Sequence, residues 1–288
     1  MQIAITGSSG ILGSSFTSFF EKQSINFFTV NRENYNPKIS INEVINYFQS
    51  QNTSIIIHCA ANTDVELCEN NEKKCFHDNY KLTEVLAEVS KKLNSKLIFI
   101  SSTGVYGNYK SNPYIESDIA TPTTIYHKSK LDAEKMIQKT LENYLIIRTG
   151  WLFGGNINSP KNFVMNRLKE ARNSNGEISS NLDQRGNPTY TNDLVKNIYT
   201  LINNNVSGLF NCVNKGNASR FDYVSEIIKL SGHSVNVNGV QKSAFDRKAN
   251  VSNNEMALNF NLSEIELNQM PEWQPSLKKY ISSLDSLL

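Results

Sequence analysis

The stretch Thr6-Gly7-Ser8-Ser9-Gly10-Ile11-Leu12-Gly13 decides how this sequence is expected to fold. It follows the apolar run Gln2–Thr6, which predicts a strand, and it opens a helical pattern. In the spacing G-x-x-G-x-x-G, Gly7 permits a tight turn, Gly10 lets the backbone approach a pyrophosphate, and Gly13 permits close helix–strand packing. Free N–H groups and the dipole at the helix N-terminus favour an anion. We therefore predict a dinucleotide site, the alternative being an ordinary strand–helix turn.

Further apolar runs alternate with helical patterns as far as Thr149. The expected strands are Phe27–Asn31, Ile55–His58, Leu97–Ser101 and Leu145–Thr149. Such nearly uninterrupted runs are typical of a parallel sheet whose two faces are both covered by helices. Helical stripes lie between them, at 41–48 behind a capping box of Ser40 and Glu43, and at 82–93. This order predicts an α/β protein with a Rossmann-type doubly wound parallel sheet.

The alternation weakens after Thr149. Loops are expected at Gly154–Asn162 and Arg172–Asn181, helices at Phe163–Ala171, Asn192–Ile202, Phe221–Leu230 and near the C-terminus, and a short strand at Gly208–Val213. We predict an NAD(P)-binding core over 1–150, completed by parts of 178–213. Residues 151–177 and 214–288 are expected to form a smaller C-terminal α/β part that binds the substrate.

The composition excludes several classes of partner. Lys and Arg number 29 and Asp and Glu 27, a net charge of +2, which predicts neither nucleic acid nor a membrane surface as a partner. No apolar run approaches the roughly 20 residues of a membrane helix, and the opening strand leaves no room for a signal peptide. We expect a cytoplasmic protein with reduced thiols and no metal site, since its four cysteines lack paired ligand spacing.

The end of the second strand bears on the choice of cofactor. It reads Val30-Asn31-Arg32, without the acidic residue that usually binds the ribose hydroxyls of NAD. Asn31 is neutral, and Arg32 could meet a 2′-phosphate. These residues favour NADP(H), with NAD(H) as the second choice. A solvent-facing arginine is the alternative interpretation of Arg32.

Tyr126 and Lys130 form the candidate catalytic pair. They lie four residues apart in a helical segment and therefore share a helix face. An ammonium beside a phenol lowers the pKa of the tyrosine and suits it to proton transfer to a carbonyl oxygen. Ser102 lies at the C-terminal end of the fourth strand, where ligands gather in open α/β sheets. A surface Tyr and Lys on an amphipathic helix are the alternative.

With these residues the chain resembles the extended short-chain dehydrogenase/reductase family, and within it the dTDP-4-dehydrorhamnose reductases and related nucleotide-sugar 4-keto reductases. The resemblance covers most of the chain. It depends on 6–13, on 58–66 with Glu69, on 101–106, on Tyr126 and Lys130, on 148–153, and on Asp183–Thr189, which matches D-Q-x-G-x-P-T. For this last piece a structural turn built by Gly186 and Pro188 is the alternative.

The resemblance implies a role for each matching residue. Ser102, Tyr126 and Lys130 would be catalytic, Tyr126 as the proton donor and Ser102 as a hydrogen-bond partner of the carbonyl. The cofactor would be bound by Gly7, Gly10, Ile11, Leu12, Asn31, Arg32, Ala60, Ala61, Asn79, Tyr126 and Lys130. The substrate would be bound by Ser102, Thr103, Tyr126, Trp151 and Arg247, although a core position is an equal alternative for Trp151.

The activity implied is reduction of a 4-keto-6-deoxy nucleotide sugar by NADPH, with hydride transfer to C4, as in dTDP-rhamnose and polysaccharide biosynthesis. Ser102-Thr103 stands where the reductases usually carry Thr-Asp, and the proline that follows the arginine in those enzymes is missing after Arg247. Two alternatives stay open: a nucleotide-sugar epimerase that retains NAD, and a non-catalytic NADP-binding regulatory subunit. The remaining partner considered is a second copy of the chain, in a homodimer. The histidines at 58, 77, 127 and 233 are interpreted as packed or surface residues.

Overall fold

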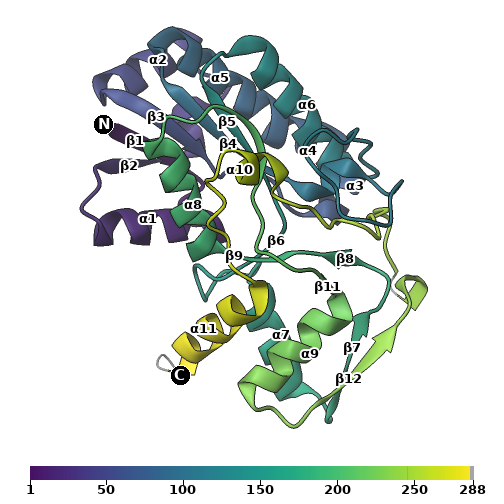
Figure 1. Cartoon of the computed structure of the whole chain (residues 1–288). Coiled ribbons are helices and arrows are strands. Elements are labelled where there is room, and N and C mark those ends of the chain that lie inside the picture. The colour runs from purple at the N-terminus through teal and green to yellow at the C-terminus, as the bar shows by residue number, and fades with distance from the viewer. Residues whose placement is uncertain (245, 286–288) are drawn as a thin grey trace.

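A six-stranded parallel sheet forms the larger part of the molecule in this computed structural model, which describes residues 1–244 and 246–285. Its strand order is β10-β5-β4-β3-β1-β2 (Figure 1). The strands are β1 (Gln2–Thr6), β2 (Phe27–Val30), β3 (Thr53–His58), β4 (Lys96–Ser102), β5 (Tyr144–Thr149) and β10 (Gly208–Asn211). Each expected strand is confirmed, with ends within two residues of those read from the sequence.

Helices cover both faces of this sheet, as the apolar runs predicted. The covering helices are α1 (Ile11–Lys22) and α8 (Thr191–Asn203) on one face, and α2 (Ile41–Ser50), α5 (Leu82–Leu93) and α6 (Ile125–Thr140) on the other. Phe16 and Phe20 of α1 are fully buried on the first face, and Phe48 of α2 and Leu86 of α5 on the second. Each side chain of this size stabilises the fold by about 2–3 kcal/mol when buried. The capping box of Ser40 and Glu43 is present at the start of α2.

The strand order reverses direction between β1 and β3. From β1 the chain crosses to β2 on one side, and β3, β4 and β5 then follow on the other side. In an open parallel sheet, a ligand binds outside the carboxyl ends of the strands at such a reversal. The fold therefore places the residues after β1 and β3, including Gly7 and Ala60, where a ligand is expected.

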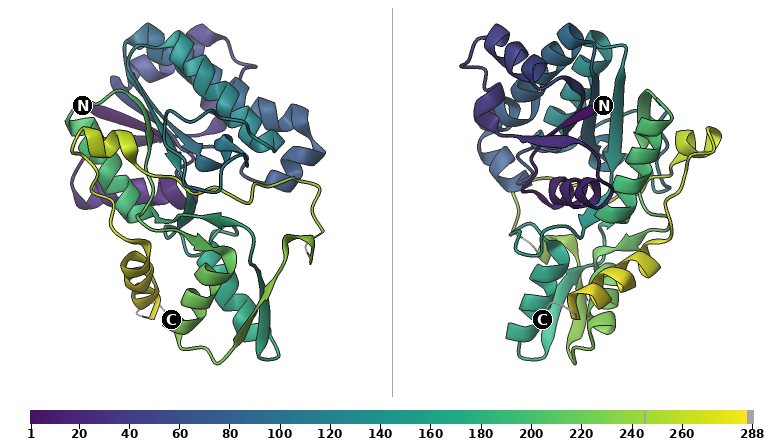
Figure 2. Two further views of the ribbon diagram at one scale, coloured as in Figure 1. Left: turned by 45° about the vertical axis from the view of Figure 1, so that its right-hand side comes forward. Right: turned by 90° about the vertical axis from the view of Figure 1, so that its left-hand side faces the viewer.

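The smaller part lies below the large sheet in both views of Figure 2. Its described residues form three two-stranded sheets and three main helices. The strand pairs are β6 (Trp151–Phe153) with β9 (Pro188–Tyr190), β8 (Arg185–Gly186) with β11 (Ala218–Ser219), and β7 (Glu177–Asn181) with β12 (Asn236–Val240). The helices are α7 (Phe163–Asn173), α9 (Arg220–Ser231) and α11 (Trp273–Asp285). Their shared core is aromatic, with Tyr223, Trp273 and Tyr280 buried in it.

Two features of this part differ from the sequence-based expectation. The interpretation of Arg172–Asn181 as a loop is wrong over its second half, because Glu177–Asn181 forms β7 in parallel with β12. Strand β7 is polar and its partner lies about 60 residues away, so no local pattern reveals it. The second difference is the segment after Leu258, which returns to the large sheet. Helix α10 (Phe260–Glu264) packs beside β10, and Leu262 and Met270 enter the sheet core (Figure 1).

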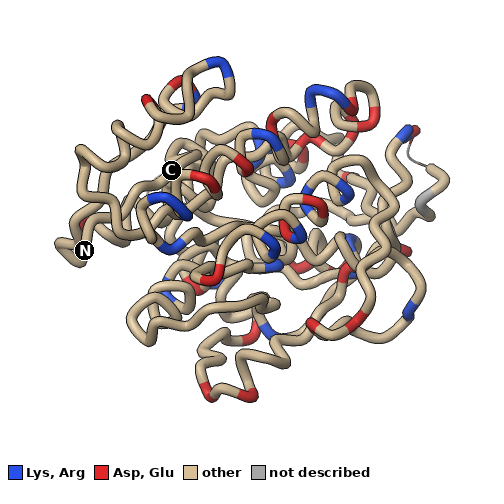
Figure 3. The backbone as a smooth tube through the Cα atoms, turned by 90° about the horizontal axis from the view of Figure 1, so that it is seen from above, with Lys and Arg blue, Asp and Glu red and all other residues tan. Residues whose placement is uncertain are grey.

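Short helical turns connect the main elements. They are η1 (Arg32–Tyr35), α3 (Val65–Asn70), α4 (Glu72–Phe76), the π-helical turn η2 (His77–Lys81), η3 (Thr103–Tyr106) and η4 (Lys242–Ala244). Basic and acidic positions are intermixed along the backbone, in keeping with the net charge of +2 (Figure 3). Among the described residues, no helix is long and apolar enough to cross a membrane.

Candidate functional site

The glycine-rich turn has the geometry that its spacing predicts. Gly7 has φ +69°, and a Cβ there would lie 2.6 Å from the backbone nitrogen of Ala60. A Cβ on Gly13 would lie 2.1 Å from the carbonyl oxygen of Gly7, so helix α1 can pack on β1 only with glycine at this position. Gly10 is the N-cap of α1, and its N–H donates to the carbonyl of Gly7 at 3.0 Å. The first turn of α1 has neither a side-chain cap nor an acidic residue. This helix end can therefore accept an anion.

A cleft of about 910 Å³ opens above this turn, between the two parts of the molecule. Its volume is typical of small-molecule sites. From the large sheet the lining residues include Gly7, Gly10, Ile11, Leu12, Asn31, Arg32, Ala60, Ala61, Ser102, Tyr126 and Lys130. The structure thus brings together most residues that the sequence assigned to cofactor and catalysis, although they come from strand ends and helices up to 123 positions apart in the chain.

The side chain of Ser102 contacts His127, a residue to which the sequence analysis assigned no functional role. His127 is buried, and its Nε2 lies 3.2 Å from Ser102 Oγ. Its Nδ1 lies 2.9 Å from Thr124 Oγ1, which also accepts from the His127 backbone N–H. Burial lowers the pKa of His127, so the imidazole is neutral at neutral pH. The contact is possible because residue 104 is glycine: a Cβ on Gly104 would lie 2.2 Å from the imidazole.

Tyr126 and Lys130 both face the cleft, and burial controls the pKa of each. Burial raises the pKa of Tyr126 above its ordinary value, and the Cys68 and Cys75 thiols and the Glu255 carboxylate add to the rise. Burial lowers the pKa of Lys130 to about 7. The expected lowering of the tyrosine pKa is therefore wrong for the protein without ligand, since desolvation raises this pKa and Lys130 is not among the groups that shift it. Tyr126 is a protonated phenol at neutral pH, which is the form a proton donor needs.

The ammonium of Lys130 lies over an aromatic ring. Its Nζ is 3.9 Å from the centre of the Phe99 ring, which belongs to β4. A cation at this distance is attracted by the negative face of the ring. The side chain is thus fixed at the bottom of the cleft, and its polar end remains available to a ligand hydroxyl.

Asn79 lies outside the cleft lining, so a direct contact with the cofactor does not follow from its position. Its side chain accepts from the Asn62 backbone N–H at 2.7 Å and donates to the Asn62 carbonyl at 3.1 Å and to Ser129 Oγ at 3.1 Å. Asn79 lies in the π-helical turn η2, a type of distortion that is frequent at functional sites. The residue joins the loop after β3 to helix α6, which carries Tyr126 and Lys130.

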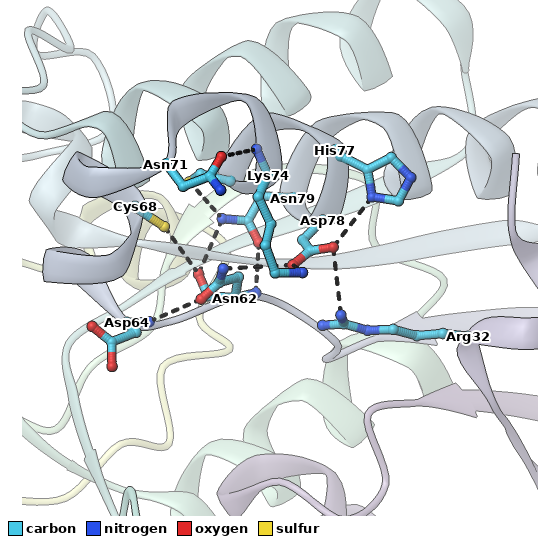
Figure 4. A network of polar contacts seen from close by, with 10 residues as sticks. Arg32, Asn62, Asp64, Cys68, Asn71, Lys74, His77, Asp78 and Asn79 are labelled. Carbon is cyan, nitrogen blue, oxygen red and sulfur yellow. Dashed lines mark hydrogen bonds and ion pairs between the residues drawn. The ribbon is translucent and has the colours of Figure 1, made fainter.

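Charged side chains surround Asp78 of η2, among them Arg32, which follows the end of β2 (Figure 4). The Asp78 carboxylate is buried and lies 3.5 Å from Arg32, 3.1 Å from Lys74 and 3.2 Å from His77 Nδ1. Although burial by itself raises the pKa of Asp78, hydrogen bonds from Lys74 and His77 lower it below its usual value. Arg32 and Lys74 both line the cleft. Two cations against one carboxylate leave this end of the cleft positive.

Behind Ser102, a buried ion pair joins the central strands to α6. Arg148 of β5 donates from Nε to Glu134 Oε1 at 3.1 Å and from its terminal nitrogen to Oε2 at 2.7 Å, and Ser101 Oγ also donates to Glu134. The guanidinium lies 4.7 Å from the centre of the Tyr106 ring. Burial alone would lower the pKa of Arg148, but the carboxylate raises it above its ordinary value. The pair holds β4, β5 and α6 in register behind the cleft.

The opposite wall of the cleft comes from the smaller part and is aromatic. Trp151, Phe163, Arg220 and Tyr223 line it. Trp151 is 8% exposed and its Nε1 donates to Glu255 at 2.6 Å. The guanidinium of Arg220 lies 3.5 Å from the centre of the indole. The position of Trp151 fits both earlier interpretations, since the residue lines the cleft and is largely covered by its neighbours.

The other residues assigned to the substrate lie outside the lining. Thr103 is buried in η3, and Arg247 is exposed in the loop after η4. The segment Asp183–Thr189 is also outside it, and its Asn187 side chain donates to the Gly216 carbonyl and accepts from the Ala257 N–H. This supports the structural interpretation of that motif.

Sequence reasoning missed Lys74, His127, Arg220 and Glu255. None of the four belongs to a motif. His127, Arg220 and Glu255 reach the site through contacts with residues distant in sequence, and Lys74 through the nearby Asp78. In the described part of the chain, no three His, Cys, Asp or Glu side chains gather as metal ligands would.

Comparison with known proteins gives concordant results. The model of the family described as RmlD substrate binding domain matches residues 1–286. The spore coat polysaccharide biosynthesis protein SpsK of Bacillus subtilis is 28% identical over 233 residues, 80% of each chain. The structure of a dTDP-4-dehydrorhamnose reductase from Clostridium acetobutylicum superposes with a TM-score of 0.93, at 28% identity over 99% of this chain and 100% of the other. That of a dTDP-4-dehydrorhamnose reductase from Bacillus anthracis in complex with NADP gives 0.90, at 27% identity over 98% and 99%.

Proposed function

This chain belongs to the RmlD substrate binding domain family, and on that premise we propose that it is an NADPH-dependent reductase of a 4-keto-6-deoxy nucleotide sugar. It is an NAD(P)-dependent oxidoreductase of the kind represented by its dTDP-4-dehydrorhamnose reductase relatives. One observation carries the finer proposal: Ser102, Tyr126 and Lys130 line the same cleft as the glycine-rich turn. Such a cleft can bring a carbonyl and a dinucleotide together.

The residues present fit a bound NADP. The uncapped N-terminus of α1 offers free N–H groups to a diphosphate, and Gly7 lets the turn pass close to the Ala60 backbone. At the other end, Arg32 and Lys74 supply the positive charge that a 2′-phosphate requires. A related reductase structure contains NADP, which supports NADP as the preferred cofactor. Bound there, the nicotinamide would supply a hydride to the carbonyl carbon.

The chain's own residues would bind the ketone oxygen and give it a proton. With the His127 imidazole protonated on Nε2, it donates to Ser102 Oγ and accepts from the Thr124 hydroxyl. Ser102 Oγ also accepts from the Gly104 N–H at 3.2 Å, which leaves its own hydrogen for the substrate oxygen. Tyr126 then transfers its phenolic proton to the oxygen as negative charge develops, and the adjacent Lys130 stabilises the phenolate that remains.

The test is oxidation of NADPH and NADH against a panel of 4-keto-6-deoxy nucleotide sugars, with the product configuration at C4 determined by NMR. We expect turnover with at least one 4-keto sugar and a higher kcat/KM with NADPH. Absence of turnover across the panel, in protein that binds NADPH, would contradict the reductase proposal.

The same purified protein separates the two alternatives. An epimerase keeps its nicotinamide between turnovers, so stoichiometric NAD released on denaturation would favour that activity. A regulatory subunit would bind NADP without consuming it. Ser102, Tyr126 and Lys130 are all present and face the cleft, which favours catalysis over a purely regulatory role.

A further inference from the structure

The smaller part presents two cationic groups to the cleft, Lys161 and Arg220. Lys161 pairs with Asp64 at 2.8 Å, whereas the surroundings of Arg220 are unusual. Arg220 begins helix α9, and its guanidinium lies 3.5 Å from the centre of the Trp151 ring and 5.1 Å from that of Phe163. The Gly186 backbone also packs closely on the indole, because a Cβ on Gly186 would lie 2.5 Å from Trp151 Cε2. Trp151 is therefore enclosed between the Gly186 backbone and Arg220. The group that this wall offers to a ligand is the guanidinium rather than the indole face.

Among the described residues, no carboxylate forms an ion pair with Arg220 within 4.0 Å, and the Glu255 carboxylate acts on it only from a longer distance. The nearest acceptor on a side chain is Gln184 Oε1, at 3.5 Å from Nε. Glu255 accepts a hydrogen bond from the Trp151 indole N–H at 2.6 Å. A desolvated guanidinium without a counter-charge is costly, so structural arginines normally have a carboxylate beside them.

Burial lowers the pKa of Arg220 to about 10, although the Glu255 carboxylate acts in the opposite direction. Repulsion by Arg247 and Arg167 makes a smaller contribution to the lowering. The group nevertheless remains charged at neutral pH, with several N–H donors directed toward a cleft. A guanidinium in this state is suited to bidentate binding of phosphate oxygens.

We propose that Arg220, supported by Trp151 and Phe163, binds the diphosphate of the nucleotide-sugar substrate. This proposal rests on the reductase function above, because it takes its ligand class from that function. The cofactor pyrophosphate has its own position at the N-terminus of α1, on the opposite wall. Arg220 thus provides a second anion subsite, which orients the sugar toward Ser102 and Tyr126 from the far side of the cleft.

The experiment is isothermal titration of the NADP-saturated protein with dTDP, UDP, thymidine and uridine. The variants are Arg220→Gln, which removes the charge, and Arg220→Lys, which keeps it. The control is Arg167→Gln: Arg167 also lies over Phe163, at 5.5 Å, but it pairs with Glu170 at 2.7 Å and lies outside the cleft lining. The dissociation constant of NADPH is measured in parallel for every variant.

We expect Arg220→Gln to weaken binding of the preferred diphosphate about 10- to 100-fold, the range for a hydrogen bond between charged groups. Binding of the matching nucleoside and of NADPH should change less than threefold, which also shows that the variant is folded. Arg220→Lys should recover most of the loss, and Arg167→Gln should bind like the wild type.

Three results would overturn the proposal. They are an equal loss for nucleoside and diphosphate, a loss of NADPH affinity that matches the loss for the diphosphate, and wild-type protein that binds neither diphosphate. The reductase proposal is judged separately by turnover. If turnover with 4-keto sugars is absent but diphosphate binding depends on Arg220, the anion subsite stands and the reductase activity does not.

Discussion

The two walls of the cleft each have an arginine stacked on an aromatic ring, and the two arginines differ in their partners. Behind the sheet wall, Arg148 lies over Tyr106 and binds Glu134 through several short hydrogen bonds. In the wall from the smaller part, Arg220 lies over Trp151 and, among the described residues, forms no ion pair with a carboxylate within 4.0 Å. The carboxylate raises the pKa of Arg148, whereas burial lowers that of Arg220 to about 10.

The difference distinguishes a charged side chain that stabilises the fold from one that is available to bind a ligand. A paired guanidinium has its charge neutralised within the chain, and it holds secondary-structure elements together. An unpaired one in a cleft leaves its charge for a ligand. We expect residues of the sheet wall to control turnover and the packing of β4, β5 and α6. Residues of the opposite wall are expected to control substrate affinity.

The largest effect is expected at Tyr126, on the sheet wall. Tyr126→Phe removes the proposed proton donor, and such groups contribute about 100- to 10,000-fold to the rate. We expect kcat to fall by this amount while NADPH affinity changes less than threefold, because the phenyl ring retains its packing. Steady-state kinetics with fluorescence titration of NADPH measures both. A kcat close to that of the wild type would remove Tyr126 from the mechanism.

The second prediction compares the removal of one carboxylate charge from each wall of the cleft. Glu134→Gln leaves Arg148 buried without a counter-charge, and the free energy of unfolding should fall by about 3–5 kcal/mol. The matched variant Glu255→Gln keeps an acceptor for the Trp151 N–H and breaks no ion pair, so it should cost about 1 kcal/mol or less. Urea denaturation of both variants measures the difference. Equal losses would mean that the Arg148 pair has no special part in stability.

The third prediction concerns pH and Lys130. Burial lowers the pKa of Lys130 to about 7, whereas a lysine in the unfolded chain titrates near 10.4. Between about pH 7 and 10 the unfolded state therefore binds a proton that the folded state does not, and stability from this group rises with pH. Relative to Lys130→Met, the ligand-free wild type should gain several kcal/mol of unfolding free energy across this window and show no further change below it.

Denaturation curves at pH 6, 7, 8.5 and 10 test this, with the exposed neighbour Lys128→Met as the control. The difference between wild type and control should be independent of pH. If the unfolding free energy of Lys130→Met also follows that of the wild type at every pH, Lys130 is charged throughout this range and its pKa is not lowered by burial.

The smallest effect is expected at the contact between Gly104 and His127. Gly104→Ala places a methyl group 2.2 Å from the imidazole and should displace it from Ser102. We expect a loss of about 1–3 kcal/mol in stability, as for other overpacked sites, and a fall in kcat. In the double variant with His127→Ala the steric cost disappears, so the two stability losses should not add. Additive losses would show that the imidazole does not occupy the space above residue 104.

The regular elements of the large sheet could be predicted because each depends on neighbours in the sequence. An apolar run forms a buried strand, Ser40 and Glu43 cap α2, and the spacing of Gly7, Gly10 and Gly13 suits one tight turn. The position of Ser102 at a strand end and of Tyr126 and Lys130 on one helix face follows from the same local rules. These rules also placed most of the proposed cofactor residues.

Contacts between distant segments could not be predicted in this way. Strand β7 is recognisable only beside β12, and the role of His127 depends on Ser102 and on the missing side chain at residue 104. The pKa of Tyr126 was misjudged for a related reason. The spacing to Lys130 is local, but burial by residues from other elements controls the pKa of Tyr126, and Lys130 is not among the groups that shift it.

The sequence by itself thus determined the parallel sheet, the dinucleotide turn and the Ser–Tyr–Lys set, because local periodicity and the conformational freedom of glycine control these features. Only the tertiary structure decided which charges are neutralised within the chain. Arg148 and Arg220 are the same residue type, each close to a strand or helix end, and nothing local tells them apart. One meets a carboxylate from α6 and the other meets an indole and an open cleft, since electrostatic pairing depends on distances that folding alone sets.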